Sequence, residues 1–96
     1  MAQKPRFRAV HSGALVWADF QGGSALNHVP SGKTHFLNEG TTLLLKRVLI
    51  EPGDAESAAA RLALLQHARL EPRLVTHVEQ LLLHLEGLGL VDRAPD

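Results

Sequence analysis

The pattern of hydrophobic and polar positions changes character near residue 38. Residues 12–37 consist of short runs typical of β-strands, whereas residues 38–90 are rich in leucine and alanine at helical spacing. A glycine turn at 21–24 and a Pro-Ser-Gly turn at 30–32 separate the strand-like runs. We therefore expect three consecutive strands in an antiparallel meander, at residues 14–20, 25–29 and 33–37.

The second half of the chain predicts three helices. Asn38 is a typical N-cap for the first, and Asp54 can cap the second. Pro72 suits the first position of the third helix, and Gly87 or Gly89 can end it in the left-handed conformation. The apolar positions of the third helix follow a 3.6-residue period: Leu74, Val78, Leu81, Leu82 and Leu85.

This order, three strands followed by three helices (βββααα), indicates an α+β fold. A three-stranded sheet cannot cover both of its own faces, so we expect the helices to pack on one face. The result is a compact unit of the winged-helix type. Ninety-six residues are enough for a single domain, whose core we expect to span about residues 7–91.

Charge and composition narrow the function. Ten Lys and Arg balance ten Asp and Glu, which argues against affinity gained by neutralising phosphates. The absence of cysteine excludes a disulfide framework, a thiolate zinc site and a cysteine nucleophile. The longest apolar run, residues 14–18, is far too short to span a membrane, and we expect no secretory signal. We expect a cytoplasmic protein with no membrane partner.

Catalytic and metal-binding motifs are missing. His77 and His84 lie seven residues apart, but the His-Glu-x-x-His motif of helical zinc sites is absent. Residues 32–34 read Gly-Lys-Thr, yet the first glycine of a phosphate-binding loop is missing. The serines and threonines are explained by turns and caps. We therefore expect no enzyme activity, no metal and no cofactor.

DNA binding is an alternative because winged-helix folds often bind DNA. The charge of the third helix is the test. Residues 72–86 carry Arg73 as the only Lys or Arg, against Glu79 and Glu86, and the turn at 21–24 is uncharged. We expect no nucleic-acid partner, and a DNA-binding regulator stays the alternative function.

The third strand-like run, residues 33–37, is expected at one end of the sheet. One of its sides then pairs with the second strand while the other is free. Such an edge is either short and protected or docks an extended peptide, and the residues leave both interpretations open. A peptide would need an apolar groove beside the edge, which we expect between the third strand and the third helix. A homodimer through the same edge is a structural alternative.

Three stretches also point to a known family. They are Trp17 in the first strand, residues 31–38 with the pattern Ser-Gly-x-Thr-His-x-Leu-Asn, and residues 81–91, LLLHLEGLGLV. Over about residues 7–91 the chain resembles the PqqD-like proteins, or RiPP recognition elements, which bind leader peptides of ribosomally made precursor peptides. More narrowly, it resembles the HPr-rel-A system PqqD family peptide chaperones.

The resemblance implies a winged-helix-like fold and no catalysis by this chain. It implies a leader peptide added as a strand along the third strand, facing the third helix, and presented to a separate modifying enzyme. The subgroup's name also implies a partner related to HPr kinase. Carried onto this sequence, the peptide-binding residues are Lys33, Thr34, His35, Phe36 and Leu37 on the strand, and Arg73, His77, Leu81 and His84 on the helix.

Overall fold

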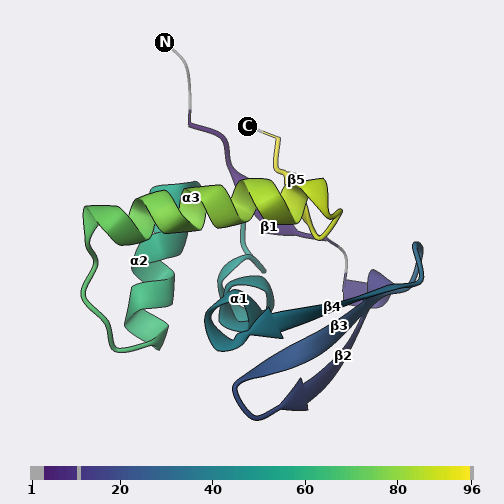
Figure 1. The fold of residues 1–96 in the computed structure, drawn as a ribbon. Helices are drawn as coiled ribbons and strands as arrows, with labels where there is room; N and C mark the ends of the chain where they lie inside the picture. The colour runs from purple at the N-terminus through teal and green to yellow at the C-terminus, as the bar shows by residue number, and fades with distance from the viewer. Residues whose placement is uncertain (1–3, 11, 96) are drawn as a thin grey trace.

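Two antiparallel sheets and three α-helices form an α+β fold in the computed structural model, which describes residues 4–10 and 12–95 (Figure 1). The larger sheet has the order β2-β3-β4 and contains β2 (Leu15–Phe20), β3 (Gly23–His28) and β4 (Lys33–Asn38). A single turn of 3₁₀-helix, η1 (Ser12–Ala14), leads into β2. The predicted α+β class, antiparallel three-stranded sheet and three helices are confirmed.

Glycines make the turns of the larger sheet. Gly22 has φ 87° in the two-residue turn between β2 and β3, and Gly32 has φ 70° in the turn between β3 and β4. Side chains on neighbouring strands line up in rows, and one row joins Trp17, Leu26 and His35. Leu26 in this row is fully buried, so the row faces the helices and the core.

The first α-helix is short. In α1 (Glu39–Leu43) the Asn38 side chain accepts a hydrogen bond from the Thr41 N–H at 2.8 Å, which confirms the predicted N-cap. The chain then widens into a π-helical turn, η2 (Leu44–Val48), closed by the Leu49 N–H and the Leu44 carbonyl at 2.9 Å. The wider turn was not predicted from the sequence. Its three apolar residues, Leu44, Leu45 and Val48, are buried, as is Leu49 directly after it.

The other two helices match their sequence signals closely. Asp54 caps α2 (Ala55–Leu65) by accepting from the Ser57 N–H at 2.8 Å. Pro72 opens α3 (Pro72–Gly87), and Gly89, with φ 81°, follows its end. The buried side of α3 consists of Val78, Leu82 and Leu85. Figure 1 shows α3 lying across the top of the molecule, over α2 at one end and toward the larger sheet at the other.

The second sheet was not predicted and changes the order of elements. It pairs β1 (Phe7–Ala9) with β5 (Val91–Arg93), so that one strand precedes the meander and another follows the helices. Phe7 is buried and exchanges backbone hydrogen bonds with Gly53 at 2.8 and 3.0 Å. A Cβ on Gly53 would come 2.5 Å from the Ser57 hydroxyl oxygen, so a larger residue here would require that side chain to shift.

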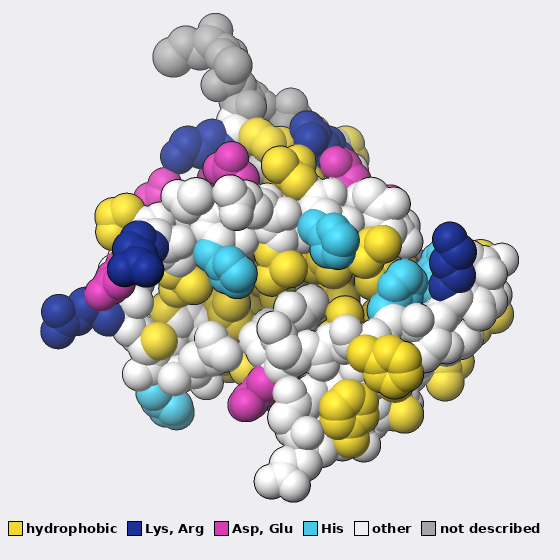
Figure 2. Space-filling model, in the orientation of Figure 1, with side chains coloured by type: hydrophobic (Ala, Val, Ile, Leu, Met, Phe, Trp, Pro, Cys, Tyr) yellow, Lys and Arg dark blue, Asp and Glu magenta, His cyan; other side chains and the backbone are white. Residues whose placement is uncertain are grey.

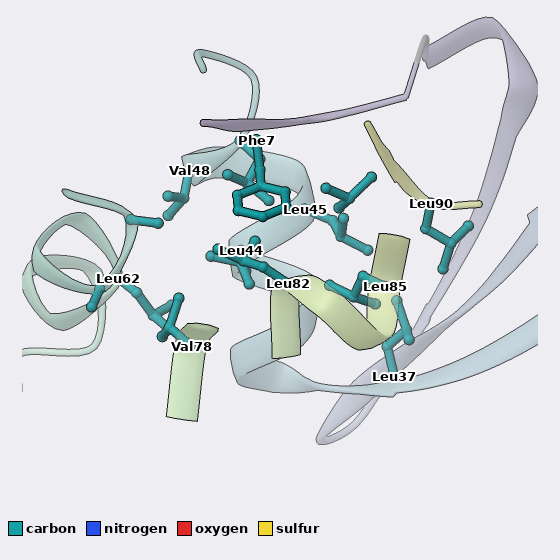
Figure 3. Packing of buried hydrophobic residues seen from close by; sticks show 14 of the residues in the cluster. Phe7, Leu37, Leu44, Leu45, Val48, Leu62, Val78, Leu82, Leu85 and Leu90 are labelled. Carbon is teal, nitrogen blue, oxygen red and sulfur yellow. The ribbon is translucent and has the colours of Figure 1, made fainter. Parts of the chain in front are cut away.

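The core lies between the sheets and the helices, as Figure 3 shows. Leu37 connects β4 to this cluster, where it lies near Leu85 in the close-up view. Packing against one face leaves the other face of the larger sheet uncovered: Val16, Phe20 and Phe36 are all more than half exposed. Within the described ranges, no helix combines the length and apolar character needed to cross a membrane.

Candidate functional site

The edge strand β4 is the starting point for the site. It pairs with β3 along its whole length, and none of the described residues forms a strand on its other side. The Asn38 carbonyl accepts a hydrogen bond from the Thr42 hydroxyl at 2.8 Å, away from β3. Because backbone groups of an antiparallel strand alternate between its two sides, the N–H and C=O of Thr34 and Phe36 also face the outer edge. These groups are available to a further strand.

A groove of about 540 Å³ runs between β4 and the second half of α3. Figure 2 shows this face hollowed, with hydrophobic side chains at its base and histidines along the rim formed by α3. Six of the predicted site residues line it: Thr34, His35, Phe36, Leu37, Leu81 and His84. The predicted juxtaposition of strand and helix at these positions is therefore present.

Three predicted residues lie outside this groove. Arg73 and His77 line a separate, shallow depression near the start of α3. The reason is the position at which the helix crosses the strand: β4 faces the later turns of α3, from Leu81 onward, and not its first turns. Lys33 begins β4 and does not line the groove.

Four groove residues were not predicted: Asn38, Thr41, Leu85 and Leu88. Leu85 is fully buried, whereas Leu88 is 37% exposed. The helical period could have identified both leucines, because they follow Leu81 by four and seven residues and so lie on the same side of the helix. Asn38 and Thr41 enter the groove through the N-cap of α1, which local periodicity does not reveal.

Of the polar side chains that line the groove, some have hydrogen-bond partners within the protein and one does not. On the outer face of the sheet, the Asn27 side-chain amide donates to the Thr34 hydroxyl at 3.1 Å. On the inner face, His35 Nε2 is buried and has no hydrogen-bond partner among the described residues. A buried polar atom in this state costs on the order of 1–3 kcal/mol. A bound group that offered His35 a partner would recover part of that free energy.

The groove offers apolar side chains, two imidazoles and a free backbone edge, a combination suited to binding an extended chain. Among the residues that the structure describes, no cluster of three or more His, Asp or Glu side chains could hold a metal ion. A second cavity of about 320 Å³ lies on the other side of α3, where it is lined by Phe7, Val75 and Leu83 among others. At its rim, the hydrogen bond from Lys4 to Glu56, at 3.0 Å, raises the pKa of the Lys4 ammonium group.

No protein-family model, curated protein or solved structure matches this chain. The interpretation of the groove therefore rests on its own geometry and on the motif of residues 31–38. That motif covers the turn before β4, the strand itself and the N-cap of α1. Residues 34–38 of that motif form one wall of the groove.

Proposed function

We propose that this chain is a non-catalytic peptide chaperone with a winged-helix-like fold. It binds the leader of a ribosomally made precursor peptide as an added strand along β4 and presents the precursor to a separate modifying enzyme in the cytoplasm. A protein related to HPr kinase is the proposed second partner. The observation that carries the proposal is the free edge of β4 beside an apolar groove.

The energetics of strand addition favour this site over a bare sheet edge. Micromolar affinity requires about 8 kcal/mol, and each backbone hydrogen bond to Thr34 or Phe36 contributes on the order of 1 kcal/mol. Ordering a flexible peptide offsets much of that contribution. Burial of guest side chains against Leu37, Leu81 and Leu88 supplies the remainder at about 25 cal/mol per Å². The groove is therefore as necessary as the edge.

Strand addition also determines which side chains of the bound peptide contact the protein. Successive side chains of a strand point to opposite faces. One set would enter the groove beside Leu37 and α3, and the other set would lie beside Phe36 on the outer face, where Phe36 is 78% exposed. A guest with apolar residues at alternate positions suits the groove, and an apolar residue at an intervening position would cover Phe36.

The test is titration of isotope-labelled protein with the candidate precursor peptide encoded beside the gene, followed by amide chemical shifts. We expect the largest shifts at residues 33–38 and 81–88. Phe36→Pro removes an outward-facing N–H and should weaken binding at least tenfold, whereas Phe36→Ala retains the N–H and should bind. Asp19→Pro, on the opposite edge strand β2, is the matched control and should leave binding unchanged.

Two results would contradict the proposal. Shifts scattered away from β4 and α3 would show that the peptide binds elsewhere. A stable dimer by light scattering, with β4 amides already protected from exchange without peptide, would show that a second copy occupies the edge. In that case the chain would be a dimerisation module and the groove a subunit interface.

A further inference from the structure

We infer that the segment bound along β4 is acidic as well as apolar, an inference that rests on the proposed function. The ion pairs of the chain provide the first argument. Four Lys and Arg side chains have acidic partners: Lys4 with Glu56, Lys46 with Asp19, Arg61 with Glu51, and Arg93 with Glu86, at 2.8–3.8 Å. The other six Lys and Arg side chains have no acidic partner within the described ranges, and two of them, Lys33 and Arg73, lie on β4 and α3.

These two unpaired cations lie at opposite ends of the surface that a guest would follow. Lys33 begins β4, and Arg73 stands in the first turn of α3. Figure 2 shows Lys or Arg side chains at both ends of the hollowed face and histidines between them. A guest that extends past the end of β4 would run from Lys33 toward Arg73, beneath the first half of α3.

The charges of α3 are divided between its two sides. At 3.6 residues per turn, Arg73, His77 and His84 fall within about 40° of one another around the helix axis. Glu79 and Glu86 lie about 120–140° away from Arg73 around the same axis. Glu86 is paired with Arg93 of β5, and Glu79 lines the cavity that contains Lys4. The groove side of α3 thus carries Arg, His and Leu without an acidic residue, while the acids face the smaller sheet and α2.

The imidazole groups of the groove also favour an acidic ligand. His35 Nε2 lacks a partner, and His84 stands across the groove from it on α3. A carboxylate accepts hydrogen bonds from imidazole N–H groups and pairs with ammonium or guanidinium groups. Two acidic residues adjoin β4 and α3 along the chain: Glu39 is the first residue of α1, and Glu71 is the N-cap of α3. Neither lines the groove. The occupant with complementary charge is an extended peptide with Asp or Glu among its apolar residues.

The experiment begins with an unbiased probe, a library of random decapeptides displayed on phage and selected against the full chain. Clones that also bind Phe36→Pro are removed, so that the remaining peptides depend on the β4 edge. Leu88→Lys, which obstructs the groove from its rim without altering the strand, serves as a second filter if Phe36→Pro folds poorly. Selected peptides are then synthesised, and their dissociation constants measured at low and high salt.

We expect the selected peptides to be enriched in both aliphatic residues and Asp or Glu. Exchange of their acids for Asn or Gln should weaken binding about three- to tenfold, and high salt should reduce that difference. The double variant Lys33→Glu, Arg73→Glu should lose the preference for acids. Arg47→Glu alters an exposed cation of η2, on neither β4 nor α3, and is the control that should keep the preference.

The possible failures are distinguishable. Peptides that depend on the β4 edge but bind equally well with amides in place of acids would overturn the inference and leave the proposed function intact. Selection that yields no peptide sensitive to Phe36→Pro or Leu88→Lys would overturn both. Enrichment of basic peptides would reverse the sign of the assigned charge and contradict the inference directly.

Discussion

The two edge strands of the larger sheet differ in how far the chain satisfies its own side chains. Beside β2, Lys46 lies over the Trp17 ring at 4.9 Å and pairs with Asp19 at 3.2 Å. Beside β4, Lys33 has no acidic partner and His35 Nε2 no hydrogen-bond partner among the described residues. Each edge adjoins an apolar depression, of about 430 Å³ at β2 and about 540 Å³ at β4. Both strands leave one backbone side without a neighbouring strand among the described residues, so the two edges differ in the partners of their side chains rather than in the volume beside them.

The difference suggests that β2 contributes mainly to stability and β4 mainly to binding. Trp17 and Leu15 on β2 pack against the core cluster, so this side contributes to folding. On β4, Leu37 performs that task while Thr34 and Phe36 are exposed. Exposed side chains such as these contribute little to the folded state until a guest covers them. The variants below exploit this contrast.

The largest effect is expected on the β2 side. Trp17→Ala removes a half-buried aromatic side chain that packs on the core and supports Lys46. We expect the free energy of unfolding to fall by about 2–4 kcal/mol, measured by urea denaturation. Peptide binding at β4 should be unchanged at temperatures where the variant is folded. Loss of binding by a folded Trp17→Ala protein would move the site to the β2 edge.

His35→Leu should have the opposite effect on stability. The substitution replaces a groove residue with a buried, unpartnered nitrogen by an apolar side chain of similar size. We expect the free energy of unfolding to rise by about 1 kcal/mol and peptide binding to weaken. His84→Leu is the matched control, because His84 lines the same groove but is exposed, and its stability should not change. A destabilised His35→Leu protein would mean that the imidazole is satisfied in solution.

The sequence predicted the parts of this molecule that depend on local pattern. The larger sheet follows from alternating positions and glycine turns, and the caps of α1 and α2 follow from Asn38 and Asp54. The smaller sheet did not follow, because β1 and β5 have three residues each and stand at opposite ends of the chain. A three-residue strand is too short for a period, and its partner is invisible to any local window.

The candidate site shows the same limit. The sequence identified β4 and α3 as its walls, and Leu81 and His84 as helix residues beside the strand. It could not tell which turns of α3 face β4, because that depends on how the helix crosses the sheet. Arg73 and His77 share a side with His84 but lie beyond the groove, and Leu88 was overlooked for the same reason.

Leu88→Ala tests whether the later turns of α3 serve binding more than stability. Leu88 is 37% exposed at the groove rim, and Leu83, 46% exposed on α3, lines the cavity on the other side. We expect each alanine variant to lose no more than about 1 kcal/mol of unfolding free energy. Peptide affinity should fall severalfold for Leu88→Ala alone. Equal losses of affinity in Leu88→Ala and in the control, Leu83→Ala, would indicate a general effect on the fold.

The smallest effect concerns the side chains that satisfy the β2 edge. A double-mutant cycle with Lys46→Ala and Asp19→Ala isolates their ion pair, in which the Asp19 side chain is 70% exposed. We expect a coupling free energy of about 0.2–1 kcal/mol that declines with added salt, since exposed pairs are screened by water and ions. Neither variant should alter the dissociation constant of the peptide at β4. New peptide binding at β2 in the double variant would show that this ion pair prevents binding at the β2 edge. The absence of an acidic partner for Lys33 would then be the feature that distinguishes β4.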